Sequence, residues 1–288
     1  MSKVAQRLLV FLIGIPSIII MVLFLPFFKN ALLNITIIVF SIIGAIEFAV
    51  MLEKKHLFIP KAEAAILGAL APTAGMLAIF FTGQKWIISL FLMSGALWIL
   101  LSGIFTRPKN IEKIAGRIVA GFSVTIYPGM FLYWLVKMSN WENSGIIILI
   151  FLLVVIGSDS AAWAAGMLWG KGNRGIIAIS PNKSVAGFIG VIVGSVIVSG
   201  GAALIVPSVF APRCGSFPPM AAAIFLGFCS GIAGALGDLT ESAIKRSCEL
   251  KDSGNIMLGR GGVLDSIDSI CVAAPVYYAL YNLLFINT

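Results

Sequence analysis

The chain has 288 residues, of which 59% are apolar and 11% are charged, and its mean hydropathy is +1.04. A soluble domain carries about 25% charged residues, so this composition excludes the soluble classes and indicates a polytopic membrane protein. The formal net charge is +8. We nevertheless expect no nucleic-acid partner, because the basic residues follow the loop pattern of a membrane protein.

Apolar runs recur along the chain, each about as long as the ~20 residues that a transmembrane helix needs. The first run follows Arg7, and its length and the lack of a small-residue cleavage site favour a transmembrane helix over a signal peptide. We predict an all-α integral membrane protein with about nine transmembrane helices. They are expected at residues 8–28, 31–52, 63–83, 85–105, 117–137, 144–169, 184–206, 219–243 and 263–286.

Most of the 20 Lys and Arg residues fall in every second connection between these runs. The positive-inside rule places such connections in the cytoplasm, which predicts a cytoplasmic N-terminus and a C-terminus outside. Intramembrane polarity in the first half is limited to Glu47, for which we expect a helix–helix hydrogen bond or a place in a cavity wall. We therefore divide the chain into an N-terminal scaffold of about five helices, 1–140, and a C-terminal catalytic region of about four helices and two cytoplasmic loops, 141–288.

Four aspartates lie inside apolar runs or at their edges, where an ionisable group is costly and usually functional. They are Asp159, Asp238, Asp265 and Asp268. Asp265 and Asp268 share one helix face, since they are three residues apart. Acidic groups gathered at one depth suit a hard cation such as Mg²⁺, which takes oxygen ligands. The alternative is a structural network in which these acids pair with nearby Lys and Arg.

Basic residues and glycines accompany these acids in two predicted cytoplasmic loops. The basic residues are Lys171, Arg174, Lys183, Lys245, Arg246, Lys251 and Arg260, and the glycines are Gly254, Gly259, Gly261 and Gly262. Glycines let the backbone approach phosphates closely. Acids, cations and glycines together are typical of phosphoryl or nucleotidyl transfer, in which positioning and charge neutralisation supply most of the catalysis.

The cysteines and the single histidine bear on which other kinds of site the chain could contain. The four Cys show no C-x-x-C spacing, which argues against a zinc site or a disulfide framework. The only His is His56, but a phosphate nucleophile is already anionic and needs no His base. Two glycine pairs four residues apart, Gly190 with Gly194 and Gly227 with Gly231, predict close helix packing.

At these residues the sequence resembles the phosphatidate cytidylyltransferase family, the CDP-diacylglycerol synthases. The family signature reads approximately S-x-x-K-R-x(4)-K-D, followed by G-G and two further acids. The residues in register with it are Ser242, Lys245, Arg246, Lys251, Asp252, Gly261, Gly262, Asp265 and Asp268. Upstream, G-D-L-T-E-S, D-S-A-A-W and S-P-N-K-S also look like the family, so the resemblance covers residues 157–270.

The resemblance implies that CTP and phosphatidate react to CDP-diacylglycerol and pyrophosphate, with Mg²⁺ and often K⁺. It implies catalytic roles for Asp238, Lys245 and Asp265, and metal ligands from Asp238, Asp265, Asp268 and Asp159. The implied substrate-binding residues are Lys171, Ser180, Lys183, Ser242, Arg246, Lys251, Asp252, Gly261 and Gly262. The partners would be CTP, phosphatidate and membrane lipids, in the bacterial inner membrane with the site facing the cytoplasm. Glycine-rich surfaces are compatible with a homodimer.

Four positions depart from the family pattern. Arg260 stands where a His is usual, and Ser266 where an Arg is usual. Val185 and Ala186 stand where a Trp and a Glu are usual. Two other functions compete with lipid cytidylyl transfer. One is a CTP-dependent kinase of a membrane polyprenol or a similar alcohol, which would transfer the γ-phosphate. The other is a cation-coupled transporter, although transporters place their sites near the midplane and often contain internal repeats.

Overall fold

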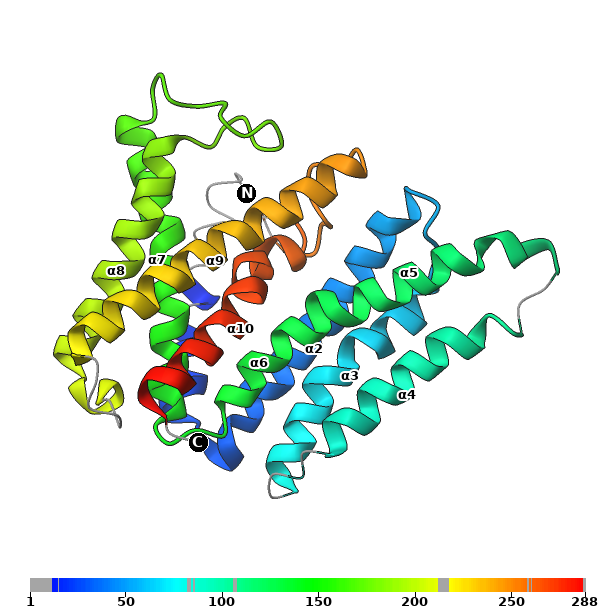
Figure 1. The fold of residues 1–288 in the computed structure, drawn as a ribbon, viewed down its shortest axis with the longest axis horizontal. Coiled ribbons are helices and arrows are strands. Elements are labelled where there is room, and N and C mark those ends of the chain that lie inside the picture. The colour runs from blue at the N-terminus through cyan, green and yellow to red at the C-terminus, as the bar shows by residue number, and fades with distance from the viewer. Residues whose placement is uncertain are drawn as a thin grey trace. The chain divides into compact units, whose positions relative to one another are not determined.

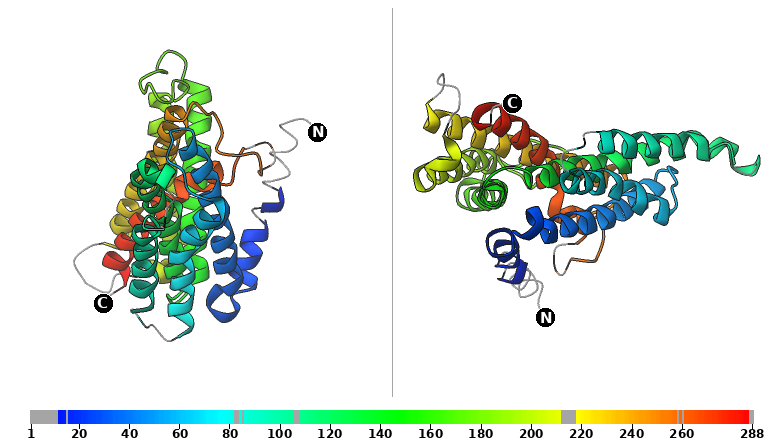
Figure 2. Two further views of the ribbon diagram at one scale, coloured as in Figure 1. Left: turned by 90° about the vertical axis from the view of Figure 1, so that its right-hand side faces the viewer. Right: turned by 90° about the horizontal axis from the view of Figure 1, so that it is seen from below.

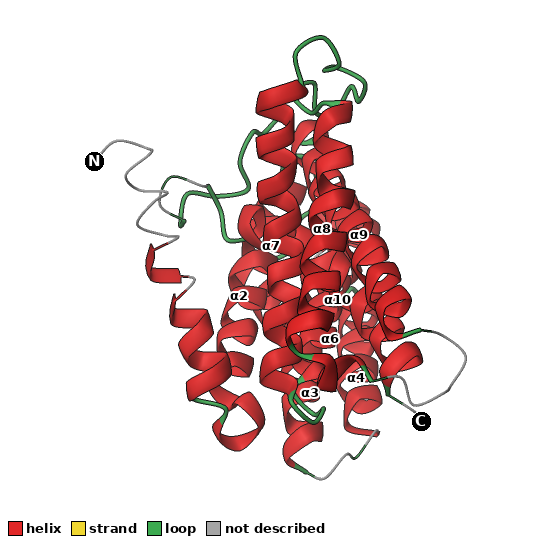
Figure 3. Ribbon diagram, turned by 90° about the vertical axis from the view of Figure 1, so that its left-hand side faces the viewer, coloured by secondary structure: helices red, strands yellow, loops and turns green. Residues whose placement is uncertain are grey.

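The computed structural model describes residues 12–14, 16–81, 84, 86–105, 108–211, 218–257, 259 and 261–286. In this part of the chain the structure consists of helices and loops, with isolated bridges at two pairs of residues (Figure 3). The α-helices are α2 (Phe27–Glu53), α3 (Lys61–Phe80), α4 (Trp86–Ser102), α5 (Ile114–Val124), α6 (Phe131–Met138), α7 (Ser144–Trp169), α8 (Val185–Ile205), α9 (Pro219–Ser247) and α10 (Leu264–Phe285). Short π or 3-10 segments are η1 (Ile20–Phe24), η2 (Pro108–Lys113), η3 (Thr125–Met130) and η4 (Pro207–Phe210).

Among the residues that the structure describes, seven helical segments are long and apolar enough to cross a membrane. They are α2, α3, α7, α8, α9, α10 and the run Ile111–Met138, which joins α5, η3 and α6. Two shorter apolar helices, Leu12–Phe24 and Trp86–Ser102, lie within the first and fourth predicted spans. The prediction of an all-α polytopic membrane protein is confirmed, whereas the count of nine spans and the orientation of the termini stay predictions.

The chain divides into two compact units. Unit 1 takes in Met1–Asn140 and Ile244–Ile267, and unit 2 takes in Trp141–Ala243 and Asp268–Thr288. The break after Asn140 lies where the sequence analysis divides the chain. However, residues 244–267, which that division assigns to the C-terminal region, belong with the N-terminal helices. Both α9 and α10 therefore contribute residues to both units.

In unit 1, α3 packs against α2, α4 and α6, the blue to green helices of Figure 2. Small residues lie where the backbones of these helices approach each other most closely. The Ser41 hydroxyl of α2 donates a hydrogen bond to the carbonyl oxygen of Gly68 on α3 at 2.7 Å. Gly75 of α3 faces the Tyr133 ring of α6, where an added Cβ would lie 2.8 Å from a ring carbon. Hydrogen bonds and small residues of this kind are the usual means of helix association in lipid.

In unit 2, α7 and α8 run side by side (Figure 1), and glycines again form the contact. Gly190 and Gly194 of α8 both face Ala161 of α7. Gly227 and Gly231 of α9 both face Ser195 of α8. The two glycine pairs therefore mark close helix packing, as predicted from their spacing.

Gly190→Ala should lower the free energy of unfolding by about 1–3 kcal/mol, the usual cost of overpacking. Its added methyl group would lie 2.7 Å from the carbonyl oxygen of Ala161 and 2.8 Å from the Cβ of Ala165. The measurement is reversible denaturation in detergent micelles. The matched control is Gly201→Ala on the same helix, because no heavy atom lies within 4 Å of that Cβ. The control should be neutral or stabilising, and equal losses in both variants would contradict this account of the packing.

Candidate functional site

The loop between α9 and α10 closes on itself just before α10 begins. Met257 and Gly261 exchange two backbone hydrogen bonds, at 2.8 and 3.2 Å. Gly261 has φ of +106°, a backbone conformation that side chains rarely adopt. An added Cβ at Gly261 would also meet the carboxylate of Asp265 and lie 3.0 Å from the Cβ of Asp252. The glycine is thus required here both by the backbone and by the close approach.

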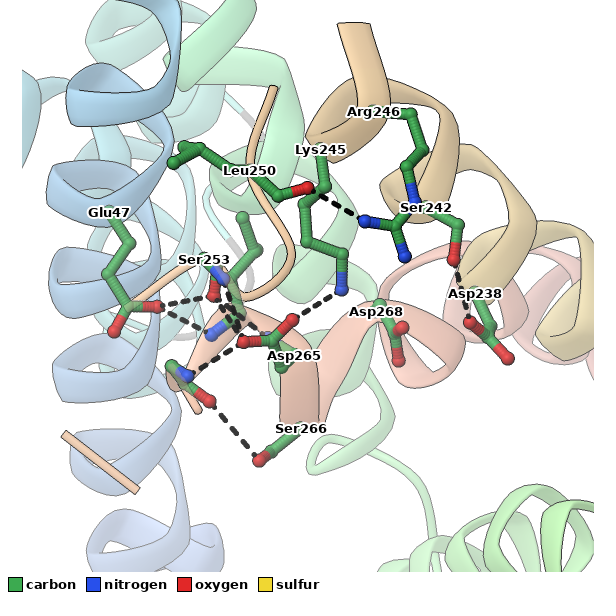
Figure 4. A network of polar contacts seen from close by, with 12 residues as sticks. Glu47, Asp238, Ser242, Lys245, Arg246, Leu250, Ser253, Asp265, Ser266 and Asp268 are labelled. Carbon is green, nitrogen blue, oxygen red and sulfur yellow. Dashed lines mark hydrogen bonds and ion pairs between the residues drawn. The ribbon is translucent and has the colours of Figure 1, made fainter. Parts of the chain in front are cut away.

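Asp265 lies in the first turn of α10, where a negative charge is favourable to the helix N-terminus. Its Oδ2 accepts hydrogen bonds from Gly262 N at 2.7 Å, Ser253 N at 2.9 Å and the Ser253 hydroxyl at 2.9 Å. Its Oδ1 forms an ion pair with the Lys245 ammonium (Figure 4). The side chains of both members of this pair are largely buried, with exposed fractions of 11% for Lys245 and 7% for Asp265. One carboxylate oxygen is therefore anchored by the loop, and the other faces a cation.

The helix α9 continues to Ser247, so Lys245 and Arg246 are helical and not part of the loop as the sequence analysis has them. Cations in the last turn of a helix are favourable to its C-terminus, which explains the extension. Arg246 is exposed and donates a hydrogen bond from Nη1 to the carbonyl oxygen of Leu250 at 3.0 Å. Lys251 and Asp252 are exposed in the loop that follows.

Glu47 of α2 is also part of this arrangement. It is 6% exposed, and its carboxylate accepts hydrogen bonds from Val263 N at 3.0 Å, Leu264 N at 2.8 Å and the Ser253 hydroxyl at 3.2 Å (Figure 4). The sequence analysis assigns Glu47 no place in the site. Its only signal in the sequence is that it is an acid inside an apolar run far from the other carboxylates.

A second lysine–aspartate pair lies in unit 2. The Lys183 ammonium is 2.8 Å from Asp238 Oδ2, and the Ser242 hydroxyl lies 3.4 Å from Asp238 Oδ1. Both side chains of the ion pair are partly exposed, at 24% for Lys183 and 39% for Asp238. The pair is thus open to solvent and to a charged ligand.

The loop between α7 and α8 holds Lys183 in place. The Ser184 hydroxyl accepts a hydrogen bond from Gly187 N at 3.1 Å and caps the N-terminus of α8. Val185 N donates to the carbonyl oxygen of Asn173 at 3.1 Å, and Lys183 N donates to that of Ser180 at 3.1 Å. The hydrogen bond to Ser180 thus fixes the backbone of Lys183. Lys171, at the other end of the loop, is exposed.

Three other acids of unit 2 interact with Asp268, which is 8% exposed. Its Oδ1 accepts a hydrogen bond from Ser269 N at 2.6 Å. Asp268 also interacts electrostatically with Asp238 and Asp159, and its carboxyl group is hydrogen-bonded to Glu241, which is fully buried. Like charges held together in a membrane span are unfavourable unless a cation or a proton compensates them. The Lys183–Asp238 pair supplies one such cation.

The described residues contain no group of three or more His, Cys, Asp or Glu side chains arranged to hold an ion. Mg²⁺ does not require such a group, because one or two carboxylates commonly hold it together with waters and substrate phosphates. Unit 2 offers Asp238 and Asp268, whose carboxylates interact electrostatically. Unit 1 offers Asp265 Oδ1, the oxygen that faces Lys245. The donor chemistry therefore fits Mg²⁺ bound jointly with phosphate groups.

The predicted site residues form two sets, one in each unit. Unit 1 contains Lys245, Arg246, Lys251, Asp252, Gly261, Gly262 and Asp265, and unit 2 contains Asp159, Lys171, Ser180, Lys183, Asp238, Ser242 and Asp268. Among the departures from the family pattern, Ser266 donates a hydrogen bond to the carbonyl oxygen of Gly262 at 3.4 Å. Ala186 is half-buried in the first turn of α8, and Arg260 lies outside the described residues.

Comparison with known proteins gives the relatives of this chain. It is 36% identical to the phosphatidate cytidylyltransferase of Bacillus subtilis over 159 residues, 55% of this chain and 56% of the relative. It is 31% identical over 176 residues to the uncharacterized protein YnbB of Escherichia coli, covering 59% of this chain and 55% of the relative. For the phosphatidate cytidylyltransferase of Chlamydia pneumoniae the identity is 33% over 208 residues, 69% of this chain and 63% of the relative.

The chain thus spans little more than half the length of the curated relatives that it matches. The model of the cytidylyltransferase family, by contrast, matches residues 5–284, which is nearly the whole chain. On the strength of that match, the chain belongs to the cytidylyltransferase family.

Proposed function

We propose that this protein is a phosphatidate cytidylyltransferase, which converts CTP and phosphatidate to CDP-diacylglycerol and pyrophosphate. The observation that carries the proposal is the ion pair of Lys245 and Asp265, in which the Asp265 carboxylate is also bonded to the backbone of Gly262. This pair lies in a chain of the cytidylyltransferase family. Relatives named phosphatidate cytidylyltransferase support the lipid substrate. The kinase and the transporter have no comparable support.

The reaction forms a bond between a phosphate oxygen of phosphatidate and the α-phosphorus of CTP. The bond from that phosphorus to its bridging oxygen breaks, and pyrophosphate leaves with the electron pair. Both substrates are anions, so the chain must supply cations to bind them and to neutralise charge on the leaving group. We assign this role to Lys183, Lys245 and Arg246. The exposed side chain of Arg246 and the partly exposed one of Lys183 make both accessible to a soluble nucleotide.

The acids would hold the cofactor. When bound, Mg²⁺ would neutralise phosphate charge and polarise the α-phosphoryl group. The proposed ligands are Asp159, Asp238, Asp265 and Asp268, with K⁺ as an accompanying ion. Asp265 is restricted in orientation by three hydrogen bonds to Oδ2, which leaves Oδ1 to face the cations. The other proposed substrate contacts come from Lys171, Ser180, Ser242, Lys251, Asp252, Gly261 and Gly262.

We further propose that the site faces the cytoplasm at the inner membrane of a bacterium. A soluble nucleotide and a bilayer-embedded lipid can react only at the interface. The Lys- and Arg-rich connections that carry the site residues belong in the cytoplasm by the positive-inside rule. The bacterial relatives support the inner membrane as the location.

The reaction can be tested by supplying the purified protein with phosphatidate, Mg²⁺ and CTP labelled at its α-phosphate. We expect label in the lipid fraction, and Asp265→Asn should reduce its rate of formation about 100-fold or more, as loss of a group that organises transition-state charge does. Glu249→Gln is the matched control, because Glu249 lies in the same loop with 87% of its side chain exposed, in a 3.5 Å ion pair with Lys55. This control should stay within about twofold of the unchanged protein.

Absence of α-label from the lipid would contradict the proposed function. If γ-label appeared instead on a prenyl alcohol, the protein would be a kinase. Full activity of Asp265→Asn would show that Asp265 is not part of the active site, although the protein would still catalyse the proposed reaction.

The orientation can be tested with single cysteines in a background that lacks the native ones. Asn255 is exposed in the loop between α9 and α10, and Ser208 is exposed in η4. By the positive-inside rule, a membrane-impermeant maleimide should label Asn255→Cys in inverted vesicles and Ser208→Cys in intact spheroplasts. The reverse pattern would place the candidate site outside the cytoplasm.

A further inference from the structure

The Glu47 carboxylate lies where the loop residues and the start of α10 meet. Oε1 accepts from Val263 N at 3.0 Å, and Oε2 accepts from Leu264 N at 2.8 Å. Leu264 is the first residue of α10, so these amides are among the N-terminal donors that have no partner inside the helix. A buried carboxylate that accepts such donors both satisfies them and stabilises the helix dipole. Glu47 thus supplies the acceptors for two amides at the start of α10.

Two glycines, Gly254 and Gly262, lie directly against the Glu47 carboxylate. An added Cβ at Gly254 would meet the carboxylate, and an added Cβ at Gly262 would meet it together with the Ser253 hydroxyl. The loop therefore closes around a charged group that comes from a different helix, and it can do so only without side chains at these two positions. If the Glu47 side chain had only a packing role in α2, the loop would not need glycines at these two positions.

Ser253 links Glu47 to Asp265. Its hydroxyl lies 3.2 Å from Glu47 Oε2 and 2.9 Å from Asp265 Oδ2, and it accepts a hydrogen bond from Asp265 N at 3.3 Å. A serine hydroxyl has only one hydrogen, so the two carboxylates share or compete for one donor. Any change at Glu47 is therefore transmitted to the Asp265 carboxylate and to its backbone.

We propose that Glu47 is a positioning residue for Asp265. Through Ser253 and the first amides of α10, it orients Asp265 so that Oδ2 stays against the loop and Oδ1 faces Lys245 and the substrate phosphates. The proposal rests on the proposed function, because it assigns Glu47 to the site that binds CTP and phosphatidate. Glu47 itself touches no substrate in this account.

Glu47→Gln tests the proposal, since the amide keeps the shape of the side chain but replaces one acceptor by a donor. We expect kcat/KM for cytidylyl transfer to fall about 10- to 100-fold, the size of effect that a small misplacement of a reacting group produces. Ser253→Ala should give a loss of similar size. Because Ser253 acts through the hydroxyl that Glu47→Gln already disturbs, the double variant should be little worse than Glu47→Gln alone.

The second readout does not depend on activity. Hydrogen–deuterium exchange in detergent should be faster at residues 250–264 in Glu47→Gln than in the unchanged protein, because the glutamine has one acceptor oxygen where Glu47 has two, and so one of the Val263 and Leu264 amides loses its acceptor. The matched control is Glu63→Gln in the same unit. Glu63 is also largely buried, but it bonds Arg117 at 2.7 Å and Trp98 at 3.0 Å. This control should leave exchange at residues 250–264 and kcat/KM unchanged, even if it lowers the melting temperature.

Three outcomes would overturn the proposal: kcat/KM of Glu47→Gln within twofold of the unchanged protein, losses that multiply in the double variant, or the same losses in Glu63→Gln. Failure of the proposed function is distinguishable from these. In that case the unchanged protein would transfer no cytidylyl group, while the exchange experiment would still report whether Glu47 orders the loop.

Discussion

The arrangement of unit 1 depends on two buried carboxylates, Glu47 and Asp265, that need hydrogen-bond donors. A buried charge without partners is strongly unfavourable, and the cost is highest where no water can replace them. The loop before α10 provides the donors as backbone amides and the Ser253 hydroxyl. Its glycines, its turn and the first residue of α10 all follow from that requirement. Asp265 keeps one oxygen for Lys245 because its other oxygen already meets the loop.

The same electrostatic constraint explains the two lysine–aspartate pairs. Lys245 with Asp265 and Lys183 with Asp238 each combine a cation with an acid of an apolar helix. Such pairs reduce the cost of placing acids at the edge of a membrane, and their members remain chemically suited to anionic phosphates and to Mg²⁺. A structural network of acids and bases and a phosphate-binding site are therefore compatible readings of the same residues.

Composition, apolar runs and charge pattern were sufficient to predict an all-α membrane protein, because lipid leaves few structures in which every backbone group is bonded. The spacing of Gly190 and Gly194 predicted a helix contact for a similar reason, since helices in lipid associate through small residues. The site residues on α9, α10 and their loop were predicted from acids, cations and glycines close in sequence, and from the family resemblance. The end of α9 was placed too early, because a hydropathy pattern treats Lys245 and Arg246 as loop residues although the helix dipole favours them.

What the sequence by itself determined is thus the class of protein, the approximate helices and the chemical types in the candidate site, all of which depend on local composition and spacing. Only the tertiary structure decided that Glu47 contacts Ser253, Val263 and Leu264, more than 200 residues away along the chain. Likewise, only the structure assigned residues 244–267 to the N-terminal unit. The physical reason is that satisfaction of a buried carboxylate is a long-range property. It depends on which donors the folded chain brings to the acid, and no periodicity or local motif records that choice.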